Sequence, residues 1–242
     1  MTAYAVISDV HANLHALEAV IKDIEGRGIE EIYFSGDIVG YGPRPNECLD
    51  IILERCKILI AGNHDWAVIG YTDTEYFNDN ALFAVEWTRD HLTDKHMDDI
   101  REFKLFKSDP ARNALFVHAT PKDPDSWDYL FSLTNAAINF RSFNQKFCFI
   151  GHSHTPVIIE NAGQGKMSAI WTSTIIQETC RYIVNVGSVG QPRDGDPRAS
   201  YAVVDNSKIE IIRVPYDIQQ TQMEMFEAGL PARLIERLSF GQ

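Results

Sequence analysis

Residues 4–28 read YAVISDVHANLHALEAVIKDIEGRG and place a strand signal directly before a helix signal. The apolar run Tyr4 to Ile7 is typical of a buried strand. Beyond Asp9 and His11, apolar residues return at helical spacing, at Leu14, Leu17, Val20, Ile21 and Ile24. Gly26 then marks the end of the helix. The segment therefore predicts a strand, a loop and a helix, with an aspartate and a histidine in the loop.

The same order recurs downstream, at residues 32–34 (strand), 36–45 (loop) and 46–54 (helix), and residues 57–60 open a third unit. Such alternation predicts an α/β layered domain, in which loops at the carboxyl ends of the strands gather functional groups at one edge. Residues 78–104 look helical and comparatively polar, which favours an outer layer or a cap. Residues 114–117 then return to a strand.

The second half of the chain has closely spaced strand signals. After a helix predicted around residues 134–145, strand-like runs occur at 147–150, 157–159, 182–186, 201–204 and 209–214. Because most of them have no crossover helix between them, they predict an antiparallel portion and a second sheet packed on the first. A last helix is predicted over 218–238. Since no linker interrupts this order, we expect a single domain over residues 1–242.

Composition and charge exclude several classes of protein. The chain has 242 residues, 45% of them hydrophobic, and a formal net charge of −12. That balance disfavours nucleic acid polymers and anionic membranes as partners. Four widely spaced cysteines form no Cys-x-x-Cys pair, and no basic leader or membrane span is evident. We therefore expect a cytoplasmic protein without a membrane anchor; a homo-oligomer is compatible with the sequence.

Five segments, each following a predicted strand, carry the candidate chemistry: Asp9-Val10-His11, Gly36-Asp37, Gly62-Asn63-His64-Asp65, His118 and Gly151-His152-Ser153-His154. Each segment alone is compatible with a turn or with a hydrogen-bonded histidine. Together they hold five of the eight histidines, and a chance arrangement of this kind is improbable. The others, His15, His91 and His96, fall on predicted helix surfaces, where we expect solvated or capping side chains.

In this order the five segments resemble the motifs of the calcineurin-like metallophosphoesterases, and the match spans Asp9 to His154. Residues 185–194, NVGSVGQPRD, resemble the small bacterial and archaeal phosphodiesterase-like branch of that superfamily. The resemblance implies a four-layer α/β/β/α sandwich of two mixed sheets flanked by helices. This agrees with the two sheets expected from the strand spacing.

The resemblance also implies two divalent metal ions. One would be held by Asp9, His11, Asp37 and His154, and the other by Asp37, Asn63, His118 and His152. Asp37 would bridge them. Carboxylate, imidazole and carboxamide ligands without thiolate suit Mn, Fe, Zn, Ni or Co. Such a centre attracts phosphate oxygens and supplies a metal-bound hydroxide that attacks phosphorus.

Two further residues are candidates for catalysis. His64 follows a predicted ligand without being one, so it would donate to the phosphoryl group or protonate the leaving oxygen, with Asp65 orienting it. The alternative is a histidine that only hydrogen-bonds its own loop. Arg193, Arg44 and Tyr41 are candidates for substrate contact. Their alternatives are surface ion pairs for the arginines and packing on a neighbouring proline for the tyrosine.

Some positions depart from the family pattern. Ala12 and Ala119 stand where glycine is frequent, and we expect both to have ordinary backbone dihedrals and to narrow the pocket slightly. The Asp-Arg pair of the Ser/Thr protein phosphatases is absent after Asp37, and the third motif ends in Asp65 rather than Glu. These departures disfavour a dedicated protein phosphatase.

The leading hypothesis is therefore metal-dependent hydrolysis of a small phosphate ester by a phosphodiesterase or phosphatase. A dinucleoside polyphosphate hydrolase and a Ser/Thr-type protein phosphatase are alternatives. A non-catalytic binding scaffold with this fold is an alternative of another class, disfavoured because the ligand set and His64 are intact. A nuclease would need a cationic groove, for which the sequence has no basic cluster.

Overall fold

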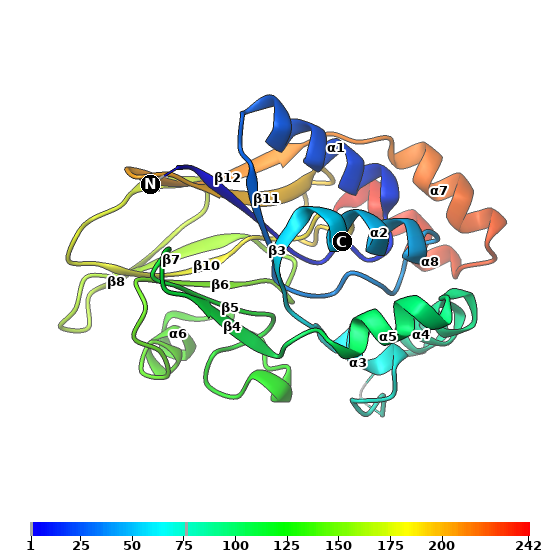
Figure 1. Ribbon diagram of the computed structural model, residues 1–242, viewed down its shortest axis with the longest axis horizontal. Coiled ribbons are helices and arrows are strands. Elements are labelled where there is room, and N and C mark those ends of the chain that lie inside the picture. Colours follow the sequence, from blue (N-terminus) through cyan, green and yellow to red (C-terminus); the bar gives the residue numbers. More distant parts are fainter. Residues whose placement is uncertain (1, 76) are drawn as a thin grey trace.

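Two six-stranded sheets form the centre of the structure, a computed structural model that describes residues 2–75 and 77–242 (Figure 1). The first sheet has the order β3 (Cys56–Leu59), β2 (Glu31–Phe34), β1 (Tyr4–Ile7), β11 (Ala199–Val204), β12 (Lys208–Val214) and β9 (Ser173–Ile175). The second has the order β4 (Phe106–Asp109), β5 (Ala114–Val117), β6 (Phe147–Ile150), β10 (Arg181–Asn185), β7 (Val157–Asn161) and β8 (Met167–Ile170).

Both sheets are mixed. In the first, β1, β2 and β3 are parallel, whereas β11, β12 and β9 add antiparallel pairs. In the second, β5, β6 and β10 are parallel, and β4, β7 and β8 run antiparallel to their neighbours. The predicted pair of mixed sheets is thereby confirmed.

Alternate side chains of β1 show how the layers form. Tyr4 and Val6 enter the apolar core between the two sheets, whereas Ala5 and Ile7 enter the core beneath the helices. This follows from the two-residue period of a strand, which sends successive side chains to opposite faces. All four side chains are buried, so β1 is covered on both faces.

Helices cover the outer faces of the two sheets (Figure 1). On the first sheet lie α1 (Leu14–Gly26) and α2 (Pro45–Arg55); on the second lies α6 (Leu133–Asn139). The predicted four-layer sandwich is confirmed. The right-hand side of Figure 1 holds α3 (Asn63–Val68), α4 (Asp79–His91), α5 (Asp94–Arg101), α7 (Ile218–Glu227) and α8 (Ala232–Arg237). Two 3₁₀ helices, η1 (Pro124–Ser126) and η2 (Leu238–Phe240), complete the helical elements of the described chain.

Several local predictions differ from the structure. The helix predicted over 134–145 ends at Asn139, and the one predicted over 218–238 is interrupted between α7 and α8, at Gly229, Leu230 and Pro231. His96 is buried rather than solvated, because its ring nitrogens lie 2.8 Å from Asn46 Oδ1 and 3.1 Å from Asp50 Oδ1.

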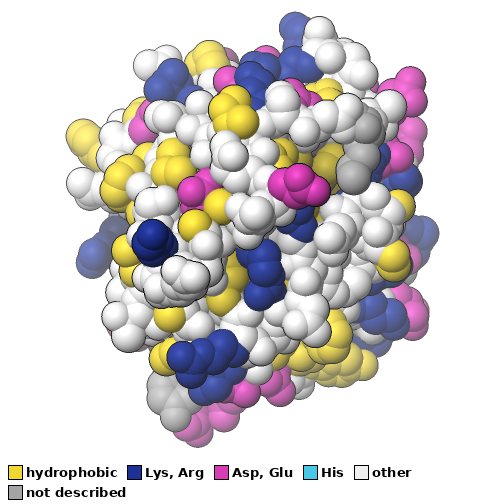
Figure 2. Space-filling model, turned by 90° about the vertical axis from the view of Figure 1, so that its left-hand side faces the viewer, with side chains coloured by type: hydrophobic (Ala, Val, Ile, Leu, Met, Phe, Trp, Pro, Cys, Tyr) yellow, Lys and Arg dark blue, Asp and Glu magenta, His cyan; other side chains and the backbone are white. Residues whose placement is uncertain are grey.

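On the face shown in Figure 2, the charged side chains agree with the expectation that the protein has no basic cluster. In Figure 2, Lys and Arg side chains are dispersed among acidic, hydrophobic and uncharged ones and form no continuous basic surface. Within the described part of the chain, no helix combines the length and the apolar character that a membrane crossing requires.

Candidate metal centre and substrate pocket

The seven predicted ligands meet where the carboxyl ends of strands from both sheets adjoin. Asp9 and His11 follow β1, Asp37 follows β2, and Asn63 begins α3 after β3. From the second sheet, His118 follows β5, and His152 and His154 follow β6. All seven are buried. Their Asp and His side chains form the groups Asp9–His11–His154 and Asp37–His118–His152, and a third group joins His11, Asp37 and His64.

The His11 and His154 rings point lone pairs at each other. Their Nε2 atoms are 3.1 Å apart, and each Nδ1 donates to a carbonyl, that of Val39 at 3.0 Å or that of Gln191 at 2.6 Å. Burial lowers the pKa of both histidines, so both rings favour the neutral form. Two lone pairs in such proximity repel unless a cation lies between them. With Asp9 Oδ1 3.1 Å from His154 Nε2, this group fits a metal ion.

The second group differs, because in it a histidine faces a carboxylate rather than another imidazole. His118 Nδ1 donates to the Ser35 carbonyl at 2.8 Å, while its buried Nε2 faces Asp37 Oδ2 at 3.2 Å without a hydrogen bond. His152 uses Nε2 to donate to the Trp127 carbonyl at 2.8 Å, which leaves Nδ1 as the available ligand atom. Burial lowers the pKa of His152 to about 3. The buried Oδ1 of Asn63 also has no hydrogen-bond partner among the described residues.

Asp37 links the groups. Its Oδ1 accepts from the His64 amide at 2.9 Å, and its Oδ2 faces His118. Burial raises the pKa of Asp37, but the neighbouring His118 and His64 lower it well below the usual range. Burial lowers the pKa of His118, but the Asp37 and Asp9 carboxylates outweigh burial and raise this pKa to about 9. The centre therefore attracts positive charge strongly, and the donor set fits divalent ions.

The loops that carry the ligands are conformationally strained. Of ten non-glycine residues with positive φ among those described, seven lie in the loops after β1, β2 and β6: Asp9, His11, Ala12, Asp37, Tyr41, His152 and His154. Each such residue costs roughly 1–2 kcal/mol relative to ordinary helical or extended backbone. Ala12 has φ 51°, so the ordinary dihedrals expected for it were wrong; Ala119 has no positive φ.

Asp65 holds one of these loops in place. Its carboxylate accepts hydrogen bonds of 2.9–3.2 Å from four backbone amides, those of Asp37, Ile38, Val39 and Gly62. No hydrogen bond joins it to His64, whose Nδ1 has no partner among the described residues. Burial and the charge of Asp37 raise the pKa of Asp65 to about 7, although amide donors favour the ionised form. The geometry therefore points to support of the Asp37 loop rather than orientation of His64.

Replacing Asp65 by asparagine is expected to lower the free energy of unfolding by about 3 kcal/mol, because an amide NH₂ group would then face backbone N–H donors. Urea denaturation of the metal-free protein would measure this. We also expect weaker metal binding, since Asp37 loses its support. An unchanged unfolding free energy together with a loss of turnover would instead favour direct action of Asp65 through His64.

Residues 185–191, part of the segment 185–194 that carried the family resemblance, support the ligands from the other side. Asn185 donates to the Gly151 carbonyl at 2.7 Å, and Ser188 Oγ donates to the Asp9 carbonyl at 2.8 Å. The carbonyl of Gln191 accepts from His154 Nδ1. The end of β10 and the loop after it thus hold residues in the loops that follow β1 and β6. The contacts of Ser188 and Gln191 could not be read from the sequence.

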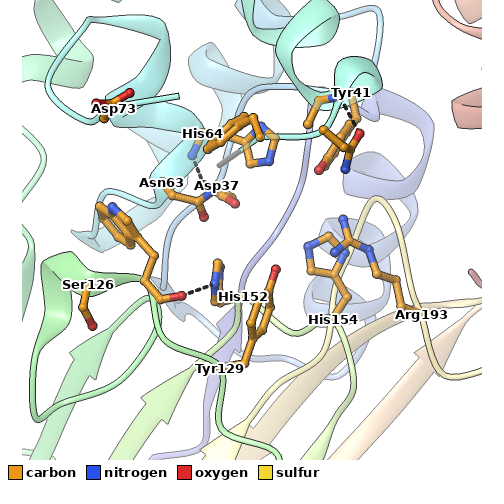
Figure 3. Close-up of a pocket in the computed structure, with 14 residues that line it drawn as sticks. Asp37, Tyr41, Asn63, His64, Asp73, Ser126, Tyr129, His152, His154 and Arg193 are labelled. Carbon is orange, nitrogen blue, oxygen red and sulfur yellow. Dashed lines mark hydrogen bonds between the residues drawn. The ribbon is translucent and has the colours of Figure 1, made fainter. Parts of the chain in front are cut away.

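The centre opens into a pocket of about 240 Å³. In Figure 3, Asp37, Asn63 and His64 lie on one side, and His152, His154 and Arg193 lie opposite. The aromatic wall consists of Tyr41, Phe77, Trp127 and Tyr129.

Two of the three candidates for substrate contact line this pocket, and the third lies elsewhere. Tyr41 packs with its ring centroid 4.4 Å from that of His64, and the guanidinium carbon of Arg193 lies 5.6 Å from the centroid of the Tyr41 ring. Both residues line the pocket. Arg44 does not; it lines a separate depression and pairs with Glu224 at 2.8 Å and Glu47 at 3.1 Å. Trp127 and Tyr129 are pocket residues that the sequence did not single out.

Comparison with known proteins decides the family. Residues 3–208 match the model of the calcineurin-like phosphoesterase superfamily domain. The chain belongs to the calcineurin-like phosphoesterase superfamily. A crystal structure of a metallophosphoesterase from Sphaerobacter thermophilus is 41% identical, with a TM-score of 0.87, and the match covers 100% of this chain and 99% of that one.

Two further proteins are similar to this chain along almost its whole length. An uncharacterized protein of Methanocaldococcus jannaschii is 39% identical, and the match covers 98% of both chains. The structure of a hypothetical protein from Pyrococcus horikoshii is 20% identical with a TM-score of 0.81, covering 100% of this chain and 99% of that one, and shares the fold. The calcineurin-like phosphoesterase fold therefore extends over the whole chain, beyond the matched residues 3–208.

Metal removal is expected to lower the melting temperature of the protein by about 10 °C, because ligands that bind only the folded state stabilise it in proportion to RT ln(1 + [L]/Kd). Differential scanning calorimetry with and without a chelator would measure the shift. Added divalent metal in excess of chelator should restore it. A melting temperature that is the same in both conditions would contradict a metal centre among these buried ligands.

Proposed function

We propose that this chain hydrolyses small phosphate esters with two divalent metal ions, as a phosphodiesterase or phosphatase. The observation that carries the proposal is the pair of neutral imidazoles, His11 and His154, whose Nε2 lone pairs face each other at 3.1 Å beside Asp9. A structural histidine would use such a nitrogen for a hydrogen bond. A pocket that opens directly onto Asp37 supports a substrate at the same centre.

The residues have distinct roles in this proposal. Asp9, His11 and His154 would hold one ion, Asn63, His118 and His152 would hold the other, and Asp37 would contact both. When bound, the ions polarise phosphoryl oxygens and lower the pKa of a water molecule, which supplies the nucleophile. Burial lowers the pKa of His64 to about 4, so its neutral ring would donate a hydrogen bond to an oxygen of the phosphoryl or leaving group.

The size and lining of the pocket support a small substrate. Its volume of about 240 Å³ and its wall of Phe77, Trp127 and Tyr129 leave room for a phosphoryl group and part of its ester substituent. Arg193 lies at the pocket with its Nε buried and unpartnered among the described residues. A guanidinium in this state suits an anionic ligand.

The test combines metal content with turnover. Protein purified without chelator would be analysed for metals and assayed with bis-p-nitrophenyl phosphate and p-nitrophenyl phosphate in Mn, Ni, Co, Zn or Mg. We expect about two metals per chain and metal-dependent release of p-nitrophenol. The ratio of diester to monoester turnover then separates a phosphodiesterase from a phosphatase. A folded protein with neither bound metal nor turnover would favour a binding scaffold.

A further inference from the structure

A second cavity adjoins the pocket at the metal centre. It has a volume of about 660 Å³, and it shares Tyr41, Asn78, Tyr129 and Arg193 with the first pocket. Its far side is built by α8 and η2, which contribute Arg233 and Arg237 among others. A molecule bound at the metal ligands can therefore continue past Arg193 into this cavity. None of these C-terminal residues belongs to the motifs that form the metal centre.

Three arginines line the second cavity without a carboxylate partner. Among residues 2–75 and 77–242, neither Arg193 nor Arg233 nor Arg237 forms an ion pair with an Asp or Glu side chain. Arg193 donates to Gln191 Oε1 at 2.8 Å, but its buried Nε has no partner. Arg237 donates to the Gln242 carbonyl. No described Asp or Glu side chain therefore pairs with these arginines, although a backbone oxygen of Gln242 lies against Arg237.

The arginines are close enough to repel one another. Burial, together with the charges of Arg193 and Arg233, lowers the pKa of Arg237 to about 10. Asp79 and Glu236 also line the cavity and reduce its positive charge, but within the described part of the chain neither forms an ion pair with these arginines. The three arginines therefore bring positive charge together in a protein whose net charge is −12. An anion between them would relieve the repulsion.

We propose that this arginine cavity binds a second phosphate group of the substrate, so that the preferred substrates are small molecules with two separated phosphates. The proposal rests on the proposed function, in which the first phosphate binds at the metal centre. Guanidinium groups match phosphate because their planar donors pair with two oxygens at once. Arg193 lies at the junction of the two cavities, where it can contact the atoms between the phosphates. A monoester would leave Arg233 and Arg237 unused.

Matched inhibitors test this subsite. Alkane-α,ω-bisphosphonates of two to six carbons would be compared by calorimetry with the alkylphosphonates of the same length, on the metal-loaded protein. We expect at least one bisphosphonate to bind about tenfold tighter than its partner, beyond the statistical factor of about two that two equal ends provide. A ratio of about two or less at every length would overturn the proposal.

Substitutions then locate the second phosphate. In the variant with Arg233→Gln and Arg237→Gln, we expect the bisphosphonate-to-monophosphonate ratio to fall to about two, the statistical value. The ratio is read within one protein, so altered metal content or folding affects both inhibitors alike. Arg233→Gln alone, at an exposed side chain, provides a variant with little risk to folding. Arg141→Gln, at an exposed arginine outside the cavity, is the matched control and should keep the ratio.

Different experimental results would contradict the proposed subsite and the proposed function. A metal-loaded protein that hydrolyses p-nitrophenyl phosphate but gives equal ratios in the native and double-variant forms would contradict the subsite alone. Absence of bound metal and of turnover would contradict the proposed function. In that case a bisphosphonate preference that is lost in the double variant would still assign an anion site to the arginines.

Discussion

Replacement of Asp37 by alanine is expected to remove both metal ions and to lower p-nitrophenyl phosphate hydrolysis by about a thousandfold or more. Asp37 is the carboxylate shared by the group with His118 and His152 and by the group with His11 and His64. Its loss leaves each ion with too few ligands. It also removes the carboxylate oxygen that accepts the hydrogen bond of the His64 amide. Elemental analysis and steady-state kinetics would measure the two effects.

Two comparisons make the Asp37 result specific. Asp37→Asn keeps the shape of the side chain but lacks the charge to bridge two cations, so it should behave almost like the alanine variant. Asp90→Ala, at an exposed carboxylate of α4 outside the pocket, should keep metals and turnover. Retention of both metals in Asp37→Ala would show that the two groups do not depend on a shared ligand.

Replacement of His64 by alanine is expected to keep both metals but to lower turnover by about 10²–10⁴-fold. The ring lines the pocket, and its Nδ1 makes no hydrogen bond within the described chain. Because a hydrogen bond to the leaving oxygen matters most when that oxygen is basic, the loss should be larger for phenyl phosphate than for p-nitrophenyl phosphate. Steady-state kinetics with the two esters would measure this difference.

Metal content separates the two interpretations of His64. The competing view is that His64 is itself a metal ligand, because His11, Asp37 and His64 place ligand atoms close enough together to hold one ion. Loss of one metal in His64→Ala would support that view. Full turnover of phenyl phosphate by metal-loaded His64→Ala would instead indicate that His64 only stabilises its own loop. His91→Ala, at an exposed histidine on α4, controls for the loss of an imidazole.

The fold was largely predictable because its central strands are apolar and are followed by helices or loops with clear signals. The three strands that were missed, β4, β8 and β9, all lie at sheet edges. Their side chains are exposed or half-buried, so the sequence carries no alternation there. The burial of His96 was missed for a related reason, since its partners Asn46 and Asp50 come from a different helix.

The candidate site was predictable to the extent that its residues form short motifs at strand ends. What could not be predicted depends on contacts between distant segments. Three of the four backbone amides that donate to Asp65 lie 26–28 residues away, in the loop after β2, whose turn directs them toward one carboxylate. The arginine cavity combines residue 193 with α8, and no local pattern connects those two segments. The positive φ of Ala12 likewise reflects the surrounding loops rather than its own preference.

The ligands come from both sheets, and this has a consequence for the order of events during synthesis. A nascent chain that has emerged from the ribosome as far as β3 and α3 carries Asp9, His11, Asp37 and Asn63, but none of the imidazoles of the second sheet. The last of these, His154, emerges well before β11, the strand that pairs with β1. A complete ion site therefore has to wait for the two sheets to dock, so ion capture would mark the end of folding rather than nucleate it.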